Sequence, residues 1–302
     1  MQSILLGSAA GGGVPQWNCW CPVCHAARES PRRVVPRTQS SLAVSADGQR
    51  WFLCNASPDV REQIARLPRG DDGALRRSPI EGVVLTDAEL DHSLGIVLLR
   101  EAGRLRLTAT CAVARTLERD SRLLPTTRAF AEVSVTELSL DEPAPLRYRD
   151  ESPSGLELLA FAVPGDPPRF ASESMAGHTV GLLIRDTATG GTCAYVPGCG
   201  ALDPSVVERV AGADVLLFDG TFWSDDELIT LGVGTRRAVE LGHAPMSGDG
   251  GSLLTLATLP SRRKIYTHVN NTNPVLVEGS AERIEVIRAG CEIGVDGVRF
   301  EL

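Results

Sequence analysis

The sequence has no long hydrophobic segment. No stretch approaches the roughly 20 consecutive apolar residues that a membrane-spanning helix needs. The first six residues, Met1–Leu6, carry neither a basic patch nor a long apolar segment, so we expect no signal peptide. These two absences predict a soluble, cytoplasmic protein.

The sequence also has no block of basic residues. It contains 30 Lys and Arg against 38 Asp and Glu, which gives a formal net charge of -8. Because nucleic acids are bound through clusters of cations, we expect no nucleic-acid partner. No repeat of fixed period is visible, which argues against a solenoid. No segment has the composition of a linker, so we expect a single domain over residues 1–302.

Short apolar, β-branched segments are present in number, and they predict strands. They are 41–44, 51–54, 82–85, 181–184, 193–196, 215–218 and 264–267. Segments with helical periodicity lie between some of them, at 58–67, 93–103, 204–210 and 252–259. Together with hairpin-like stretches in 100–150, this alternation indicates an α/β fold in which helices cover two sheets.

Polar residues follow several of these strands directly. The residues in question are Asn55, Ser57, Asp87, Asp219 and His268. Where helices alternate with strands, polar groups at strand ends meet at one rim of the sheet and build a site there. We therefore expect these five side chains to lie near one another.

Three of the eight cysteines, Cys19, Cys21 and Cys24, lie within six residues of each other after a glycine-rich loop. Thiolates that converge on a turn can hold one tetrahedral ion, so we predict a structural zinc site. Its fourth ligand would be His25 or a residue from the far end of the chain. A redox pair or simply buried thiols are the alternative. The other five cysteines lie among apolar neighbours, as buried thiols do.

A second cluster of potential ligands lies between a predicted strand and a helical segment. Asp87, Glu89, Asp91 and His92 occupy six positions in near-alternation. A loop at a strand end can direct such groups at one point, whereas a solvated loop is the alternative. We predict a metal site in a cleft at this position.

This strand–D-x-E-x-D-H–helix unit resembles the H-x-H-x-D-H metal motif of the metallo-β-lactamase superfamily. Asp87 and Glu89 stand in place of its first two histidines. Asp219-Gly220-Thr221 looks like the superfamily's metal-bridging aspartate, and His268 looks like its last metal-binding histidine. The resemblance implies an αββα sandwich, in which helices flank two mixed β-sheets.

The opening loop adds a finer resemblance within the superfamily. Its C-x-C-x-x-C is similar to that of the phosphonate-pathway phosphodiesterases, which carry a structural zinc there. Their fourth zinc ligand is a histidine three residues after the last cleft histidine, and that position here is Asn271. The resemblance therefore leaves Asn271, His25 or water to complete the zinc site.

Longer stretches resemble the PQQ-biosynthesis protein B family. They are 6–19, 37–41, 55–59, 219–223, 232–236, 242–243 and 268–274. The resemblance implies a role in the synthesis of pyrroloquinoline quinone (PQQ). It also implies that an iron enzyme uses O₂ to hydroxylate the tyrosine of a Glu–Tyr unit from the precursor peptide. The expected partner is that small peptide-derived substrate or PQQ itself, and a homodimer is left open.

The small number of histidines indicates which metal ion the site can hold. Five histidines are few for a site that holds two zinc ions mainly through imidazoles. Two imidazoles with carboxylates suit iron(II) and leave positions open for O₂ and substrate. We predict Fe²⁺ held by Asp91, His92 and His268, with Asp219 as an additional or alternating ligand. His178 does not align with a ligand position, and we expect it to lie outside the site.

Further residues are expected around this metal. His243 is a candidate general acid or base, with a supporting role as the alternative, and Asp87 and Glu89 are expected to take part in catalysis. Arg236 and Arg237 are expected to hold substrate carboxylates, with solvation at the surface as the alternative, and Asn55, Ser57 and Asp59 are expected to support the substrate site. An arginine can bind a substrate carboxylate through two hydrogen bonds.

Two other functions stay open at this point. The first is a metal-dependent hydrolase, which would need a second metal ion and a bridging hydroxide. The second is a carrier without enzymatic activity that binds PQQ or its precursor and assists its transport toward the periplasm. A redox-inactive ion in the cleft would favour either of these over the hydroxylase.

Overall fold

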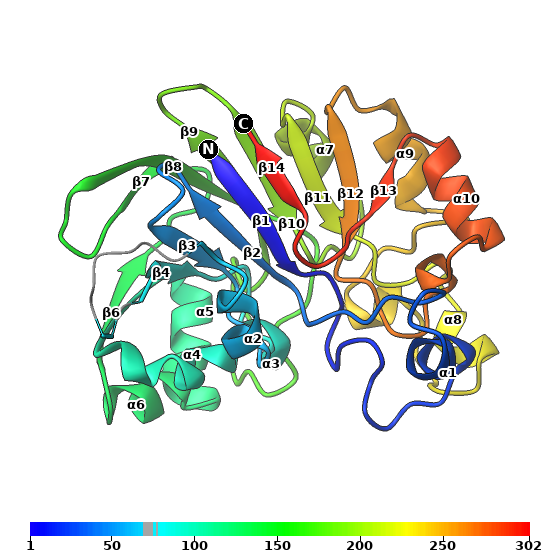
Figure 1. The fold of residues 1–302 in the computed structure, drawn as a ribbon, viewed down its shortest axis with the longest axis horizontal. Coiled ribbons are helices and arrows are strands. Elements are labelled where there is room, and N and C mark those ends of the chain that lie inside the picture. The colour runs from blue at the N-terminus through cyan, green and yellow to red at the C-terminus, as the bar shows by residue number, and fades with distance from the viewer. Residues whose placement is uncertain (69–74, 77) are drawn as a thin grey trace.

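The computed structural model describes residues 1–68, 75–76 and 78–302, whose strands form two seven-stranded sheets (Figure 1). Across the first sheet the order is β14 (Arg299–Glu301), β1 (Gln2–Gly7), β2 (Ser41–Ser45), β3 (Trp51–Cys54), β4 (Ile80–Val84), β5 (Arg104–Ala109) and β6 (Glu132–Glu137). Across the second it is β13 (Glu292–Ile293), β12 (Arg263–Thr267), β11 (Val215–Asp219), β10 (Thr192–Val196), β9 (Val180–Asp186), β8 (Pro153–Ala162) and β7 (Ala144–Arg147).

Helices cover the outer face of each sheet (Figure 1). Those beside the first sheet are α2 (Val60–Ile64), α3 (Leu90–Ser93), α4 (Gly95–Leu98), α5 (Cys111–Arg115) and α6 (Leu123–Arg128), with short turns at Arg100–Ala102 and Thr116–Asp120. Those beside the second are α1 (Pro22–Glu29), α7 (Pro204–Val210), α8 (Glu227–Thr230), α9 (Ser252–Thr258) and α10 (Ala281–Arg288), with turns at Val239–Leu241 and Pro274–Leu276. The predicted αββα sandwich is confirmed.

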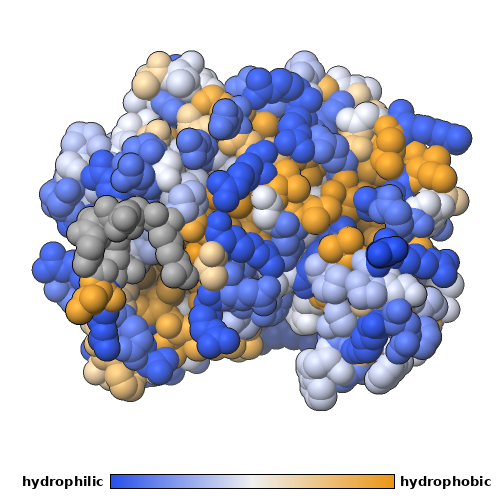
Figure 2. Space-filling model, viewed as in Figure 1, coloured by the Kyte–Doolittle hydropathy of each residue, from blue (hydrophilic) through white to orange (hydrophobic). Residues whose placement is uncertain are grey.

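Three apolar clusters hold these layers together. Successive side chains of β1 point to opposite faces of the sheet. Leu5 packs between the sheets, whereas Ile4 and Leu6 pack against the helices of the first sheet. A third cluster joins the second sheet to α1, α7, α9 and α10. Each fully buried aliphatic side chain contributes about 1.5–3 kcal/mol. On the face drawn in Figure 2, apolar side chains gather over α10, where Ile284 and Ile287 are exposed, and further apolar surface lies near the middle of the view and at its lower left, between hydrophilic areas.

The direction of the strands determines where the site lies. Strands β3 to β6 run parallel in the first sheet, and β10 to β13 run parallel in the second. Across the two sheets, the Val180 amide donates to the Thr86 carbonyl oxygen at 2.9 Å. The loops after β4, β11 and β12 therefore open at one shared rim, as the polar strand ends predicted.

The predicted strands and the helical segments 204–210 and 252–259 appear within about two residues of their expected bounds. The hairpin-like interpretation of 100–150 is wrong for most of that segment. Strands β5 and β6 pair in parallel, and α5 and α6 lie between them. In the described residues, no helix is long and apolar enough to cross a membrane.

Candidate metal centres and cleft

The turn after β4 is held by the loop after β3. The Thr86 amide donates to Asn55 Oδ1 at 3.0 Å, and Asn55 Nδ2 donates to Thr86 Oγ1 at 2.9 Å. Asn55 has a φ of 67°, a left-handed conformation that asparagine adopts more readily than most residues. The Ala56 amide donates to the His92 carbonyl oxygen at 2.7 Å. The D-x-E-x-D-H segment is thus fixed at both ends.

Within this turn, Asp87 orients His92. The distance from His92 Nδ1 to Asp87 Oδ2 is 2.7 Å. Because the carboxylate accepts from Nδ1, Nε2 on the opposite side of the ring is the nitrogen that can bind a metal ion in place of a second proton. His92 Nε2 is buried without a hydrogen-bond partner among the described residues. Such an atom costs about 1–3 kcal/mol, so a ligand is expected there.

Asp91, His92 and His268 offer ligand atoms that all lie within 4.8 Å of one another. Asp91 Oδ2 lies 3.2 Å from His268 Nε2 and 3.9 Å from His92 Nε2. His268 has a φ of 55°, a left-handed conformation that is uncommon for residues with a side chain. We call these three residues the cleft triad. The donor set fits one transition-metal ion with open positions.

The electrostatics of the cleft triad favour a cation. Burial lowers the pKa of His92, but the carboxylates of Asp87 and Asp91 outweigh this effect and raise it to about 9. Burial also acts on Asp91, yet the charge of His92 and the hydrogen bond from His268 hold the pKa of Asp91 well below its usual range. The carboxylates therefore attract positive charge, which a metal ion supplies as well as a proton does.

Asp219, His243 and His268 form a second group of ligand atoms within 4.8 Å. The Thr221 hydroxyl lies among them. Its Oγ1 is 2.6 Å from Asp219 Oδ1, 3.1 Å from His243 Nδ1 and 2.8 Å from His268 Nδ1. Asp219 Oδ1 also accepts from the Thr221 amide. Asp219 Oδ2 accepts from the Cys199 amide and contacts His243 Nδ1. This group is a satisfied hydrogen-bond network, with Asp219 fully buried inside it.

The three N-terminal cysteines converge as predicted, with their sulfur atoms within 4.8 Å of one another. Cys21 precedes α1, and its Sγ accepts from the Cys24 amide at 3.5 Å. The Cys21 amide in turn donates to Cys19 Sγ. Burial raises the pKa of the Cys21 thiol to about 12, so a zinc ion that binds here must displace a proton. We call Cys19, Cys21 and Cys24 the cysteine clip.

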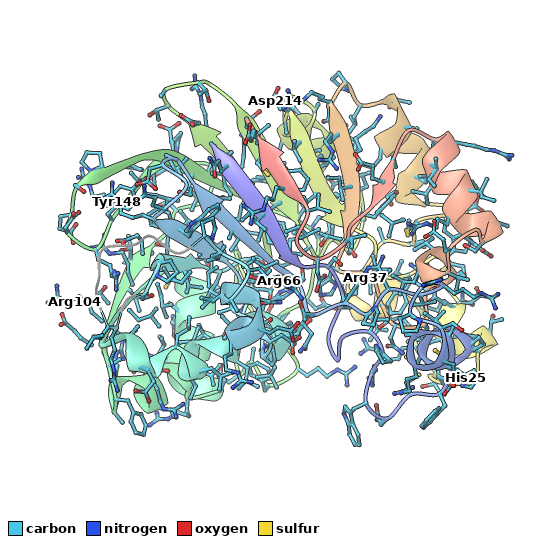
Figure 3. The ribbon with its side chains drawn as sticks, in the orientation of Figure 1. His25, Arg37, Arg66, Arg104, Tyr148 and Asp214 are labelled. Carbon is cyan, nitrogen blue, oxygen red and sulfur yellow. The ribbon has the colours of Figure 1, made fainter. Side chains whose placement is uncertain are left out.

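Asn271 faces the cysteine clip from the C-terminal half of the chain. Its carbonyl oxygen lies 3.4 Å from Cys21 Sγ, and its Nδ2 lies 3.2 Å from Cys24 Sγ. Either the carbonyl oxygen or the amide side chain can serve as the fourth ligand atom. His25 does not belong to the clip, because it is exposed on α1 at the edge of the molecule (Figure 3). The prediction that His25 completes the zinc site is wrong.

One segment connects the clip to the cleft triad. Asn271 follows His268 by three residues, and Val269 between them lies in a bridge with the N-terminal loop. The Val269 amide donates to the Ser8 carbonyl oxygen, and the Ala10 amide donates to the Val269 carbonyl oxygen. The clip and the cleft triad are therefore joined by a three-residue segment that the N-terminal loop holds in place.

The cleft triad lies in a cleft of about 800 Å³, which suits a small ligand. Arg236, Glu89 and His243 contribute to its lining, as expected for residues that meet a substrate. Asn55 and Ser57 do not. Both are fully buried, and the Ser57 hydroxyl donates to Gln63 Oε1 at 2.9 Å. They therefore do not contact a ligand in the cleft directly, and their hydrogen bonds support the neighbouring loops, in keeping with the expected supporting role.

The cleft also contains residues that the sequence analysis did not single out. Arg169, Phe170, Gln39 and Phe222 line it. Arg169 and Phe170 belong to the loop between β8 and β9, which has no periodicity from which their direction could be inferred. His178 lies outside the cleft, in a separate small cavity beside α5, in keeping with the expectation that it is no ligand.

Known proteins share this fold and much of this sequence. A family model described as a beta-lactamase superfamily domain matches residues 50–269. The chain is 46% identical to coenzyme PQQ synthesis protein B of Methylobacterium nodulans and 43% identical to that of Rhodopseudomonas palustris, with 100% of each chain covered. The chain belongs to the PQQ synthesis protein B family. Its membership confirms the resemblance that the motifs indicated.

The crystal structure of a member of the family is also known. The crystal structure of Zn²⁺-bound PqqB from Methylobacterium extorquens matches with a TM-score of 0.89 and 40% identity, and 100% of both chains is covered. A diphosphatase of the PhnP family matches with a TM-score of 0.68 and 21% identity over 100% of this chain and 97% of the other. That second likeness shows the fold alone.

Proposed function

We propose that the chain acts in PQQ biosynthesis as an iron-dependent hydroxylase that uses O₂ and acts on the tyrosine of a Glu–Tyr unit. The names of its relatives support the pathway. The observation that carries the finer proposal is a contrast between two groups of ligand atoms. His92 Nε2 in the cleft triad has no partner, whereas the Thr221 hydroxyl already satisfies the second group.

The cleft triad would hold the metal. Two imidazoles and one carboxylate form the donor set of mononuclear non-haem iron(II) oxygenases. When bound, iron(II) would supply the O₂ chemistry that amino-acid side chains lack. A dinuclear hydrolase would need a second set of ligands. Asp219 Oδ1 and Oδ2 each already make two hydrogen-bond contacts, so for Asp219 to serve in that set at least one of them would have to be displaced.

The protein's own residues position the ligands and hold protons. Asp87 keeps Nδ1 of His92 occupied, so it is a positioning residue that acts through that ring. Thr221 holds Nδ1 of His268 in the same manner. His243 contacts Asp219 through Nδ1, which leaves its Nε2 for a proton exchange with substrate. Burial lowers the pKa of His243, but the carboxylate of Asp219 outweighs this effect and raises it, which favours a role as a proton donor.

Besides O₂ and the peptide, the proposed reaction needs a soluble reductant. A ring C–H bond of the substrate becomes C–OH, and one oxygen atom of O₂ enters that bond. The other oxygen atom leaves as water, which takes two protons and two electrons. A soluble reductant supplies the electrons, and His243 can deliver one of the protons.

Mass spectrometry of the product tests this proposal. The protein is reconstituted with Fe(II) without oxygen and then incubated with Glu–Tyr, O₂ and a reductant. We expect the tyrosine to gain oxygen, and we expect His92→Ala and His268→Ala to abolish the gain. His25→Ala is the matched control, because its imidazole is exposed and lies outside both metal groups. No gain in mass, with iron bound no better than zinc, would refute the hydroxylase and favour the hydrolase or the carrier.

A further inference from the structure

The cleft has a particular distribution of charge around the cleft triad. Its lining contains five carboxylates, and the Lys or Arg side chains among its described lining residues are Arg169 and Arg236. Both are exposed, and neither forms an ion pair within the part of the chain that the structure describes. The adjacent Arg237 differs, because its Nη1 lies 3.0 Å from Asp225 Oδ2. Two guanidinium groups are thus available to a ligand.

The two arginines come from different loops. Arg169 lies between β8 and β9, in a loop whose Pro164 carbonyl oxygen accepts from the Gly200 amide at 2.6 Å. Arg236 lies in the loop that ends at His243, and the Ala238 amide anchors that loop on the Asp225 carbonyl oxygen at 2.8 Å. Both loops are therefore tied to the protein near the cleft.

The two arginines share one cleft with the cleft triad. Asp91, His92 and His268 belong to the same lining as Arg169 and Arg236. A ligand that contacts both guanidinium groups would therefore lie in the cleft that contains the metal position.

We infer that Arg169 and Arg236 bind two separate carboxylates of the substrate and so select a compound with two acidic groups. The inference deepens the proposed function and rests on it, since Glu–Tyr carries a γ-carboxylate and a C-terminal carboxylate. In a chain with a net charge of -8, an anionic ligand is repelled unless cations meet its charges. A guanidinium group meets a carboxylate through two parallel hydrogen bonds, which fix orientation as well as position.

An apolar surface completes the arrangement. Phe222 is buried beside the cleft, and its ring centroid lies 6.0 Å from that of His243 in an edge-on contact. Phe170 lies next to Arg169 in the same lining. With both carboxylates bound, the tyrosine ring would rest on these apolar groups close to the cleft triad, which is the orientation that hydroxylation requires.

Direct binding tests this inference without relying on turnover. Dissociation constants are measured by calorimetry, with zinc-loaded protein and no oxygen, for Glu–Tyr, Gln–Tyr and Glu–tyrosinamide. We expect Arg169→Gln and Arg236→Gln each to weaken Glu–Tyr by about ten- to a hundredfold, the usual effect of losing a charge-assisted pair. Each variant should show no further loss for the one analogue that lacks its carboxylate. Arg237→Gln is the matched control and should bind all three ligands like the unaltered protein.

The outcomes separate the inference from the proposed function. If an arginine variant loses the same affinity for all three ligands, or loses none, the assignment of one substrate carboxylate to each arginine is wrong even if Glu–Tyr is hydroxylated. Carboxylate-specific losses without any oxygen gain on Glu–Tyr would support the two arginines as a binding site and refute the hydroxylase. The substitutions are at exposed side chains, so unfolding does not obscure the result.

Discussion

The carboxylate of Asp87 determines which nitrogen of His92 faces the cleft. We expect Asp87→Asn to weaken metal binding about ten- to a hundredfold, because an amide can donate as well as accept and no longer enforces one tautomer. Competition with a chelator of known affinity measures the loss. Asp166→Asn is the matched control, since this exposed carboxylate of the same cleft belongs to neither metal group. Equal affinities in the two variants would refute the positioning role.

Single residues also show where sequence reasoning reached its limit. The clustering of Asp91, His92 and His268 could be predicted, since each follows a strand that ends at the same rim. The position of Thr221 within the second group could not, because a hydroxyl in a D-G-T motif does not show which nitrogens it will meet. Arg169 was missed for a similar reason: an irregular loop gives no periodicity that would fix the direction of its side chains.

At the scale of elements, the junction of α3 and α4 depends on one glycine. A Cβ atom on Gly95 would lie 2.3 Å from the Ser57 carbonyl oxygen and 2.6 Å from that of Ala56. We expect Gly95→Ala to destabilise the fold by about 1–3 kcal/mol through overpacking, as measured by chemical denaturation. Gly212→Ala should be nearly neutral, because nothing lies within 4 Å of its added methyl group. A neutral Gly95→Ala would contradict this packing.

At the start of α8, a buried carboxyl group makes the stability of the fold depend on pH. Glu227 begins α8 and is buried, and its Oε2 accepts from the Trp223 amide at 2.6 Å. Burial raises its pKa from 4.5 to about 7. The folded chain then binds this proton more tightly than the unfolded chain. The stabilisation is complete below about pH 4.5 and is lost as the pH rises to about 7.

The variant Glu227→Gln tests the direction in which stability changes with pH. The stability of the unaltered protein, measured by denaturation, should fall relative to that of the variant by up to about 3 kcal/mol between pH 4.5 and pH 7. Above pH 7 the difference between the two proteins should stay constant. Parallel stability curves across the whole range would contradict the buried, shifted carboxyl group.

The buried strands of the second sheet's centre and of β2 to β4 were visible in the sequence as short apolar segments, whereas β1, β8 and the short strands β7, β13 and β14 were not predicted. The segment that contains β5 and β6 was predicted with the wrong pairing. Both strands alternate apolar with polar residues, which is typical of hairpins. Their parallel pairing depends on α5 and α6 between them, whose short sequences have no clear helical period.

At the scale of the whole molecule, the cysteine clip joins the two ends of the chain. Cys21 and Cys24 contact Asn271, about 250 positions away, and β1 pairs with β14. We expect zinc removal by a chelator, or Cys21→Ser, to lower the unfolding midpoint by roughly 10 °C. A ligand at a thousand times its Kd contributes about 4 kcal/mol. Cys111→Ser is the control outside the clip, and an unchanged midpoint after zinc removal would refute the structural role.

The central claim concerns the source of the oxygen that enters the substrate. The direct measurement is mass spectrometry of Glu–Tyr after parallel reactions of the iron-loaded protein with isotopically heavy O₂ in ordinary water and with ordinary O₂ in heavy-oxygen water. The account predicts that the tyrosine product carries the heavy isotope only when O₂ supplies it, and that His268→Ala yields neither product. Label that comes from water alone would contradict the oxygenase.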